Sequence, residues 1–131
     1  MKTIASVALA VAMGAAAVGP AAAAADLTGN WGPGDKSTTY HFTMCGDSGK
    51  NVCVDLIALR DHMDTPKNRP YLNTRLVERA KPSGDNVWKG KMSVFGVTGD
   101  ATITMLNPEL LSVNLCAYIV MCKEYKLRPV D

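Results

Sequence analysis

The sequence has almost no excess of charge of either sign. Its 131 residues include 14 Lys and Arg against 12 Asp and Glu, which gives a formal net charge of +2 at pH 7. Proteins that bind nucleic acid carry a clear positive footprint, and proteins held at anionic membranes by charge carry a cluster of Lys and Arg. The near balance of charge argues against both classes, so we expect no nucleic-acid partner.

The sequence also lacks the common catalytic motifs. It holds no G-x-S-x-G elbow, no H-E-x-x-H pair and no phosphate-cradling glycine loop. His62 lies between Asp61 and Asp64, the kind of groups that a metal or acid–base site requires, and His41 is able to reach Asp55. The second pair has no third ligand, and polar residues in a loop are more often simply solvated. We therefore expect no enzyme activity, no catalytic residue, no bound metal and no cofactor.

The longest largely apolar stretch of the chain lies at the N-terminus. Lys2 gives a positive start, residues 4–18 are mostly Ala and Val, and a run of alanines ends at Ala25. This order predicts a secretory signal peptide over residues 1–25, cleaved before Asp26. A transmembrane anchor is the alternative, but it needs about 18 to 20 strongly apolar residues, and this run is shorter.

The chain after Ala25, residues 26–131, has the length of a single small domain. An even number of cysteines in an exported chain indicates disulfides, here two. We expect the protein in the periplasm or outside the cell, and no later apolar run is long enough to span a membrane. All four cysteines lie in this part of the chain: Cys45, Cys53, Cys116 and Cys122.

No part of the mature chain keeps a helical period of useful length. Instead, apolar and polar residues alternate in short segments separated by Gly, Pro, Asn and Asp, which predicts β-strands joined by turns. Only residues 60–73 form a long connection, and it alone has room for a helical turn. The predicted strands are residues 27–31, 38–45, 52–59, 74–81, 87–95, 101–106, 110–116 and 122–127.

The cysteine spacing allows a test of strand register. Pairing Cys45 with Cys53 across an antiparallel hairpin puts apolar residues opposite one another on one face and mostly polar residues on the other. Pairing Cys116 with Cys122 does the same for the last hairpin, except that Lys123 then faces an apolar residue. A slip by one residue would move each apolar set to the wrong face. We therefore predict these two disulfides rather than either other connectivity.

Eight short antiparallel strands, each with one apolar face, need to bury those faces together. Closing the sheet on itself does so and also removes its exposed edges. The sequence therefore predicts an all-β fold, a small eight-stranded up-and-down antiparallel barrel with two hairpin disulfides. Two packed sheets satisfy the same alternation, so a β-sandwich is the alternative.

Several short motifs, taken in order, indicate a family. Gly29-Asn30-Trp31 resembles the G-x-W signature of lipocalin-like barrels, in which the Trp closes one end. From about Leu27 to Pro129 the chain resembles a family of small secreted bacterial proteins called domain of unknown function 2147. The resemblance implies a lipocalin-like barrel and brings no established activity. It is carried by Gly29-Asn30-Trp31, Cys45-Gly46, Cys53, Asn68-Arg69-Pro70, Gly84-Asp85, Trp88-Lys89-Gly90, Cys116, Cys122 and Leu127-Arg128.

The inward residues of such a barrel form either a solid core or a pocket. An eight-stranded barrel is just wide enough to be filled by side chains or to hold one small ligand. Short strands and bulky inward residues favour filling. If a ligand enters, we expect the mouth near Trp31 and Trp88. The apolar contacts then come from Trp31, Tyr40, Phe42, Trp88 and Met92.

The predicted strand 74–81 carries charge on both of its faces. Leu76 and Glu78 share one face, while Arg75 and Arg79 lie on the other. A buried unpaired charge is costly. Either Glu78 or an arginine therefore meets a polar group of a ligand in the barrel mouth, or the segment is an edge strand whose charges stay solvated, which we favour. The first interpretation adds Glu78 to the candidate ligand-binding residues.

The tip of the last predicted hairpin is apolar, where Gly, Asn or Asp would be normal. Tyr118, Ile119, Val120 and Met121 lie there, between the last two cysteines. An exposed apolar tip is typical of a contact surface for a partner. The alternative is that the tip folds over the barrel end as a lid or packs on the long connection, residues 60–73.

Two functions from different classes follow from these features. The first is a non-catalytic binder of a small apolar ligand that uses the barrel interior. The second is an envelope-associated protein-binding or inhibitor module that acts through the apolar tip, residues 117–121, with a solid core. The sequence does not indicate an oligomeric state.

Overall fold

The structure, a computed structural model, describes residues 25–118 and 121–130. Two 3-10 turns, η3 (Asp61–Met63) and η4 (Arg69–Tyr71), occupy the connection in which the sequence has room for a helical turn. Within the described residues, no helix has the length and apolar character needed to cross a membrane. The strands are β1 (Gly29–Gly32), β2 (Thr38–Cys45), β3 (Asn51–Leu59), β4 (Arg75–Gly84), β5 (Val87–Val94), β6 (Val97–Asn107), β7 (Leu110–Tyr118) and β8 (Met121–Pro129).

Two predicted features fall on residues that the structure does not describe. Apart from Ala25, the predicted signal peptide lies outside the described residues. Ile119 and Val120, at the centre of the apolar hairpin tip, lie outside them as well.

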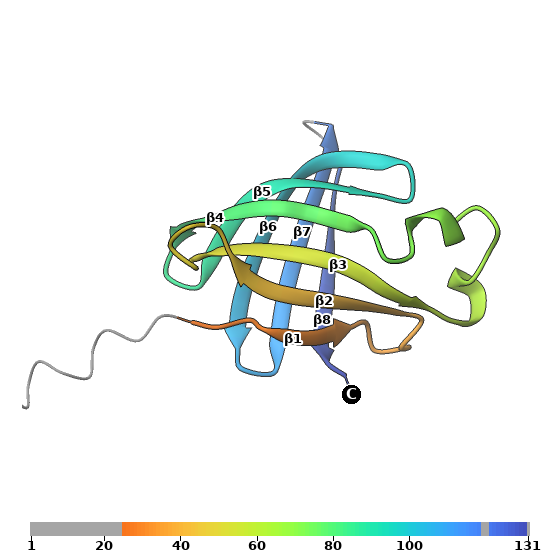
Figure 1. Ribbon diagram of the computed structural model, residues 1–131, viewed down its shortest axis with the longest axis horizontal. Helices are drawn as coiled ribbons and strands as arrows, with labels where there is room; N and C mark the ends of the chain where they lie inside the picture. Colours follow the sequence, from red (N-terminus) through yellow and green to blue (C-terminus); the bar gives the residue numbers. More distant parts are fainter. Residues whose placement is uncertain (1–24, 119–120, 131) are drawn as a thin grey trace, which may run out of the picture.

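The eight strands form a closed barrel in which each strand pairs antiparallel with the next along the chain. The last strand returns to the first, where Trp31 pairs with Pro129 and Gly32 with Arg128. Figure 1 shows β2, β3 and β4 lying across the view, while β7 and β8 lie along its height in opposite directions. The predicted up-and-down barrel is confirmed, and the alternative sandwich is wrong.

The alternating strands divide the connections between two ends of the barrel. At one end lie the β2–β3, β4–β5 and β6–β7 turns, together with both described chain ends, Ala25 and Val130. The backbone N–H of Val130 donates to the carbonyl of Asn30 at 2.9 Å. The β1–β2 and β5–β6 turns and the long connection 60–74 lie at the opposite end, where β7 finishes and β8 begins. We call these the sealed end and the open end, for the reasons given below.

Tightly packed apolar side chains close the sealed end. Trp31 is 4% exposed and donates its indole N–H to the carbonyl of Leu27 at 2.9 Å. Trp88 donates in the same way to the carbonyl of Lys50, in the β2–β3 turn, at 3.0 Å. Each ring therefore fills core space while its polar atom is satisfied. The buried residues at this end are Leu27, Trp31, Val52, Ala80, Trp88 and Leu111.

Both predicted disulfides, Cys45–Cys53 and Cys116–Cys122, are present. The register of the last hairpin is confirmed, because Cys116 pairs directly with Cys122. The register of the β2–β3 hairpin is wrong by two residues, since Cys45 pairs with Asn51 and Cys53 with Thr43. Side chains alternate with a period of two, so this slip leaves the same residues on the inner face. The Cys45–Cys53 bridge therefore runs diagonally between the strands.

A glycine explains why β6 begins four residues earlier than predicted. The sequence places a turn at residues 98–100, whereas the turn is at Phe95-Gly96 and Gly99 lies within the strand. A Cβ on Gly99 would lie 2.2 Å from the carbonyl oxygen of Cys116 and 2.8 Å from the Cα of Ala117. Gly99 is thus required for the close approach of β6 to the end of β7 rather than for a turn.

Candidate functional site

The open half of the barrel contains a cavity of about 520 Å³. Its floor is a layer of buried side chains in the middle of the barrel, formed by Phe42, Val54, Val77, Ile103, Val113 and Leu127. Above this floor the walls are formed by Thr38, Tyr40, Met92, Val94, Phe95, Leu115 and Tyr125. The rim consists of Pro33, Asp35, Ser37, His62, Met63 and Lys123. The barrel is thus filled at one end and hollow at the other, so the expectation of a solid core holds only for the sealed end.

Three of the predicted ligand-binding residues line this cavity. They are Tyr40 and Phe42 on β2 and Met92 on β5. Trp31 and Trp88 do not line it, because both are packed at the sealed end with their indole N–H groups held by backbone carbonyls. The prediction of a mouth near the tryptophans is therefore wrong. The mouth lies at the opposite end of the barrel.

Glu78 lies on the outer wall of the barrel and not in its interior. Irregular pairing of β4 with β3 allows two consecutive residues, Leu76 and Val77, to be buried, while Arg75 and Glu78 stay exposed. Such a bulge turns successive side chains to the same face of a sheet. Because β4 pairs with both β3 and β5, it is not an edge strand either. Glu78 is not placed to meet a ligand inside the barrel.

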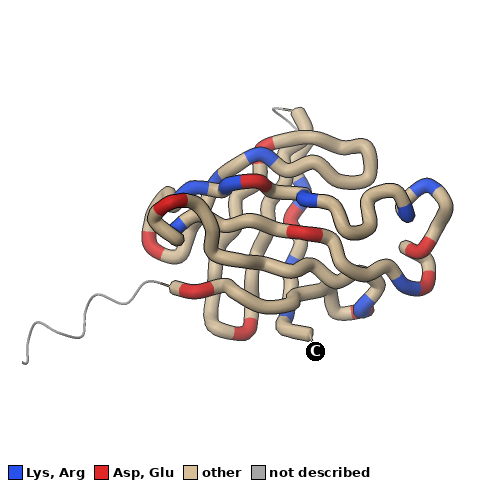
Figure 2. Tube along the Cα trace, viewed as in Figure 1, with Lys and Arg blue, Asp and Glu red and all other residues tan. Residues whose placement is uncertain are grey.

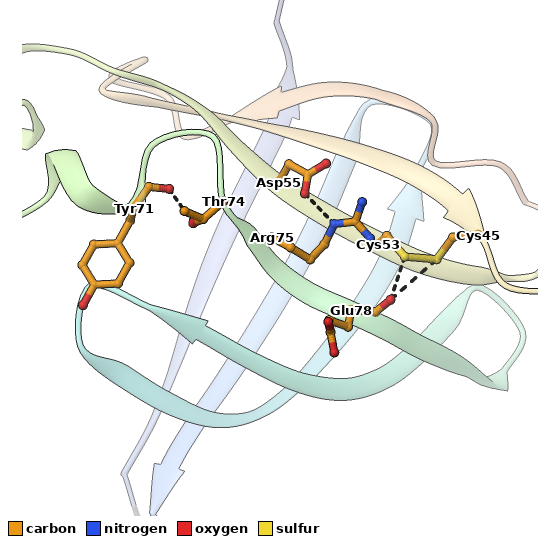
Figure 3. Close-up of polar contacts among 7 residues, drawn as sticks. All are labelled: Cys45, Cys53, Asp55, Tyr71, Thr74, Arg75 and Glu78. Carbon is orange, nitrogen blue, oxygen red and sulfur yellow. Dashed lines mark hydrogen bonds and ion pairs between the residues drawn. A yellow bond between two sulfur atoms is a disulfide. The ribbon is translucent and has the colours of Figure 1, made fainter.

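The surroundings of Glu78 are a depression of about 550 Å³ on the outer wall, beside the Cys45–Cys53 bridge. Arg75 pairs there with Asp55 at 2.5 Å, and the sulfur of Cys53 lies 2.7 Å from the main-chain carbonyl oxygen of Glu78 (Figure 3). The sulfurs of a disulfide carry no hydrogen, so this is a close contact and not a donated hydrogen bond. The charges of β4 are therefore solvated or paired on the outer surface.

A pair of polar residues occupies one side of the cavity rim. The Oδ1 atom of Asp35 accepts from the backbone N–H of Ser37 at 2.9 Å and from its hydroxyl at 2.7 Å. These bonds to Ser37 hold the pKa of the Asp35 carboxyl below its ordinary value. The second oxygen of Asp35 faces Nε2 of His62 at 3.9 Å, and both side chains are largely exposed.

The histidines and acidic residues considered as candidate catalytic or metal sites do not lie together in the structure. Among the described residues, no group of three or more His, Cys, Asp or Glu is arranged to hold a metal ion. Asp64 pairs with Arg69 at 2.8 Å rather than with His62. His41 lies opposite Asp55, but its Nδ1 bonds to the side-chain oxygen of Asn30 at 2.7 Å.

An aromatic residue in an unusual backbone conformation forms part of the cavity wall. The β5–β6 turn has Phe95 and Gly96 as its two central residues, with φ angles of 50° and 81°. Positive φ at both positions is the pattern of a type I′ turn, which favours Asn-Gly. Phe95 makes an edge-to-face contact with Tyr71 in η4, with ring centroids 5.6 Å apart. This contact joins the turn to the long connection 60–74 across the rim.

The described part of the apolar hairpin tip is exposed. Tyr118 is 72% exposed and Met121 is 61% exposed. These two side chains therefore do not pack over the barrel end as a lid. Tyr118 and Met121 stand at the open end, next to the rim that Lys123 helps to form.

Lys123 lines the cavity but is not among the predicted ligand-binding residues, although the sequence carried a signal for it. The predicted hairpin register puts Lys123 opposite an apolar residue, and the structure confirms its pairing with Leu115. Leu115 is buried and faces inward, so the lysine opposite it belongs to the inner face as well. Val54, Val77 and Phe95 also line the cavity without having been singled out as ligand-binding residues.

Comparison of the chain with protein-family models, with curated proteins and with solved structures finds no match. The charge distribution indicates no particular class of partner, because Figure 2 shows positive and negative residues scattered along the strands and loops. The case for a function therefore depends on the chain's own residues.

Proposed function

We propose that this protein is a non-catalytic binder of a small apolar molecule, which it holds in the open half of the barrel. The observation that supports this most directly is the cavity of about 520 Å³, closed by the sealed end and lined mainly by apolar side chains. Pockets for small molecules typically measure about 300 to 1,000 Å³ and are mostly apolar with a few polar groups. The proposal needs no reaction, so no catalytic group is assigned.

The cavity walls combine rigid and adaptable side chains. Phe42, Val54 and Ile103 are almost fully buried and give the floor a fixed shape. Met92 is half-buried and lines the wall, and its unbranched thioether adapts to ligands of different outline. Apolar surface that a ligand buries here contributes about 25 cal/mol per Å² before the entropy cost of binding.

Native mass spectrometry of protein purified gently from its oxidising compartment tests this proposal first. A native mass that exceeds the denatured mass by one small-molecule increment supports a bound ligand. The denatured mass also reports whether the chain starts at Asp26 and whether both disulfides have formed.

A cavity-filling variant tests the location of binding. We expect N-phenyl-1-naphthylamine, a neutral fluorescent probe, to bind the wild-type protein, and Met92→Trp to weaken this binding at least tenfold by occupying the cavity. Leu106→Trp is the matched control, because Leu106 is half exposed on β6 and does not line the cavity. A bare native mass together with equal probe binding by all three proteins would contradict the proposal.

We further propose a periplasmic or secreted location and membership of the lipocalin-like family domain of unknown function 2147. Both disulfides fit an oxidising compartment. The closed eight-stranded barrel and the Trp31 side chain that closes one end of it fit the family resemblance. Detection of the mature chain, starting at Asp26, in a periplasmic or culture fraction tests the location.

A second candidate function is supported by the exposed apolar side chains of Tyr118 and Met121. These residues would then contact an envelope protein, with the cavity playing no part. Two variants separate the candidates. Tyr118→Ser combined with Met121→Ser should weaken binding to an envelope protein and leave probe binding unchanged, whereas Met92→Trp should weaken only probe binding.

A further inference from the structure

One positive charge, that of Lys123, stands at the cavity rim. Lys123 is on the inner face of β8, opposite the buried Leu115, and its Nζ lies 5.4 Å from the ring centroid of Tyr125. Such a position over a ring face attracts the ammonium toward the cavity wall. Among the described residues, no Asp or Glu lies within ion-pair distance of Lys123, whereas Lys91 and Lys126 have Asp100 and Glu124 nearby.

The other titratable groups at the rim do not offset this charge directly. They are Asp35 and His62. The Asp35 carboxylate accepts two hydrogen bonds from Ser37, and its second oxygen faces His62. The Asp35 charge is thus already engaged by neighbouring donors, whereas no Asp or Glu in the described part of the chain pairs with the ammonium of Lys123.

A phenol hydroxyl lies on the same wall, below the rim. Tyr40 is mostly buried, and this burial raises the pKa of its hydroxyl. The hydroxyl therefore stays protonated at neutral pH and remains a hydrogen-bond donor. Tyr125 on β8 and Tyr40 on β2 both line the cavity, and only β1 separates their strands. Both rings therefore lie on the side of the barrel from which Lys123 reaches the rim.

The cavity is therefore apolar at its floor and rich in donors on one side of its mouth. We infer that the ligand is an amphipathic acid, whose apolar body fills the cavity over Phe42 and Ile103 and whose carboxylate is held at the mouth by Lys123. A hydrogen bond from a charged donor to a carboxylate is stronger than a neutral one and gives the ligand a fixed orientation. This inference rests on the proposed function, since it requires the cavity to be the binding site.

Displacement of N-phenyl-1-naphthylamine by three ligands with the same chain tests the inference. They are decanoate and decyltrimethylammonium, each used below its critical micelle concentration, and 1-decanol, used below its solubility limit. We expect decanoate to displace the probe at about tenfold lower concentration than the cationic compound, because one charge-assisted bond contributes roughly that factor. Added salt should weaken decanoate more than decanol, because salt screens charges at an exposed rim.

Two lysine variants on the same strand locate the effect. Lys123→Met keeps most of the side-chain length without the charge, and we expect it to abolish the preference for decanoate, measured as the ratio of the concentrations at which decanoate and decyltrimethylammonium displace the probe. Lys126→Met is the matched control, because Lys126 pairs with Ser112 on the outer face, and we expect it to retain the preference. Urea unfolding of both variants shows that the fold is kept.

The outcomes separate the two proposals. Probe binding that Met92→Trp weakens, with equal displacement by all three ligands or an unchanged preference in Lys123→Met, overturns the inference and leaves the proposed function standing. Absence of binding of both the probe and decanoate, the latter measured by calorimetry, overturns both.

Discussion

The two ends of the barrel are formed by the same strands but differ in what their side chains and turns do. At the sealed end, Trp31 and Trp88 fill the interior and give their N–H groups to backbone carbonyls. At the open end, the inner residues Met92 and Tyr125 border a cavity, and Tyr125 is 43% exposed. One half of the barrel therefore provides stability, and the other half leaves space that stability alone does not require.

The turns show the same difference. The β4–β5 turn at the sealed end uses Asn86 for its residue with positive φ, which is a usual choice. The β5–β6 turn at the open end uses Phe95 in that conformation, and the β7–β8 connection is flanked by the exposed Tyr118 and Met121. Departures from local folding preferences tend to occur at functional sites. The open end collects several of them.

The largest expected change in the free energy of unfolding comes from shortening side chains at the two ends of β5. Trp88 and Met92 both point inward from β5. Trp88→Ala should lower the free energy of unfolding by about 3 to 5 kcal/mol, since it leaves a new cavity in packed core. Met92→Ala should lower it by about 1 kcal/mol or less, because its side chain already borders a cavity. Urea unfolding measures both, and equal losses would show that the open end is packed as tightly as the sealed one.

The two disulfides should differ more in their accessibility to a reducing agent than in their contribution to stability. Each closes a short loop and is expected to stabilise the fold by about 2 to 3 kcal/mol. Cys53 at the sealed end is 3% exposed, whereas Cys122 at the open end is exposed. We expect mild dithiothreitol to reduce Cys116–Cys122 first, as alkylation and peptide mass analysis would show. Simultaneous reduction of both bridges would mean that the sealed end opens as readily as the rim.

The Phe95→Asn variant separates a binding role from a folding role at the open end. Asn adopts positive φ readily, whereas other residues lose about 1 to 2 kcal/mol there. Loss of the contact with Tyr71 costs roughly 0.5 to 1.5 kcal/mol. The variant should therefore unfold at a similar or slightly higher urea concentration, yet bind the naphthylamine probe several-fold more weakly. A clear loss of stability with unchanged probe binding would make Phe95 a folding residue.

The smallest effect on stability is expected at the hairpin tip. Tyr118→Ser combined with Met121→Ser should change the free energy of unfolding by less than about 0.5 kcal/mol, because both side chains are exposed. Probe binding should also be unchanged if the cavity alone holds the ligand. A large loss of stability would show that the tip packs against the barrel.

The barrel was predictable because the period of two in a strand tolerates a register error of two residues. The β2–β3 hairpin illustrates this, since a pairing wrong by two residues still gave the inner face correctly and still brought Cys45 near Cys53. The last hairpin was predicted with its exact partners, because Cys116 and Cys122 are directly opposite one another. Alternation and cysteine spacing together determine which side chains point inward.

Irregular strand features were not predictable in the same way. A bulge in β4 buries Leu76 and Val77 together, so strict alternation misplaced Glu78. Glycine is common in turns, so Gly99 suggested a turn. Its actual place within β6 depends on the close approach of the Cys116 carbonyl from β7. Neither effect is local, since each requires knowledge of the neighbouring strand.

The position of the mouth was the main error at the site. Trp31 and Trp88 are large apolar residues, which suit a ligand pocket and a packed core equally well. Their indole N–H bonds to Leu27 and Lys50 decide for the core, and those partners are backbone carbonyls that a sequence does not distinguish. Lys123 carried a better signal, as a charged residue in an apolar register position.

The even number of strands has a practical consequence for handling the protein. Ala25 and Val130 both leave the barrel at the sealed end, and the mouth lies at the other. A purification tag, a fluorescent fusion partner or a linker to a solid support can therefore be joined at the C-terminus without covering the entrance. Immobilised in this orientation, the barrel would present its mouths to the solution, as a surface-based sensor for small molecules requires.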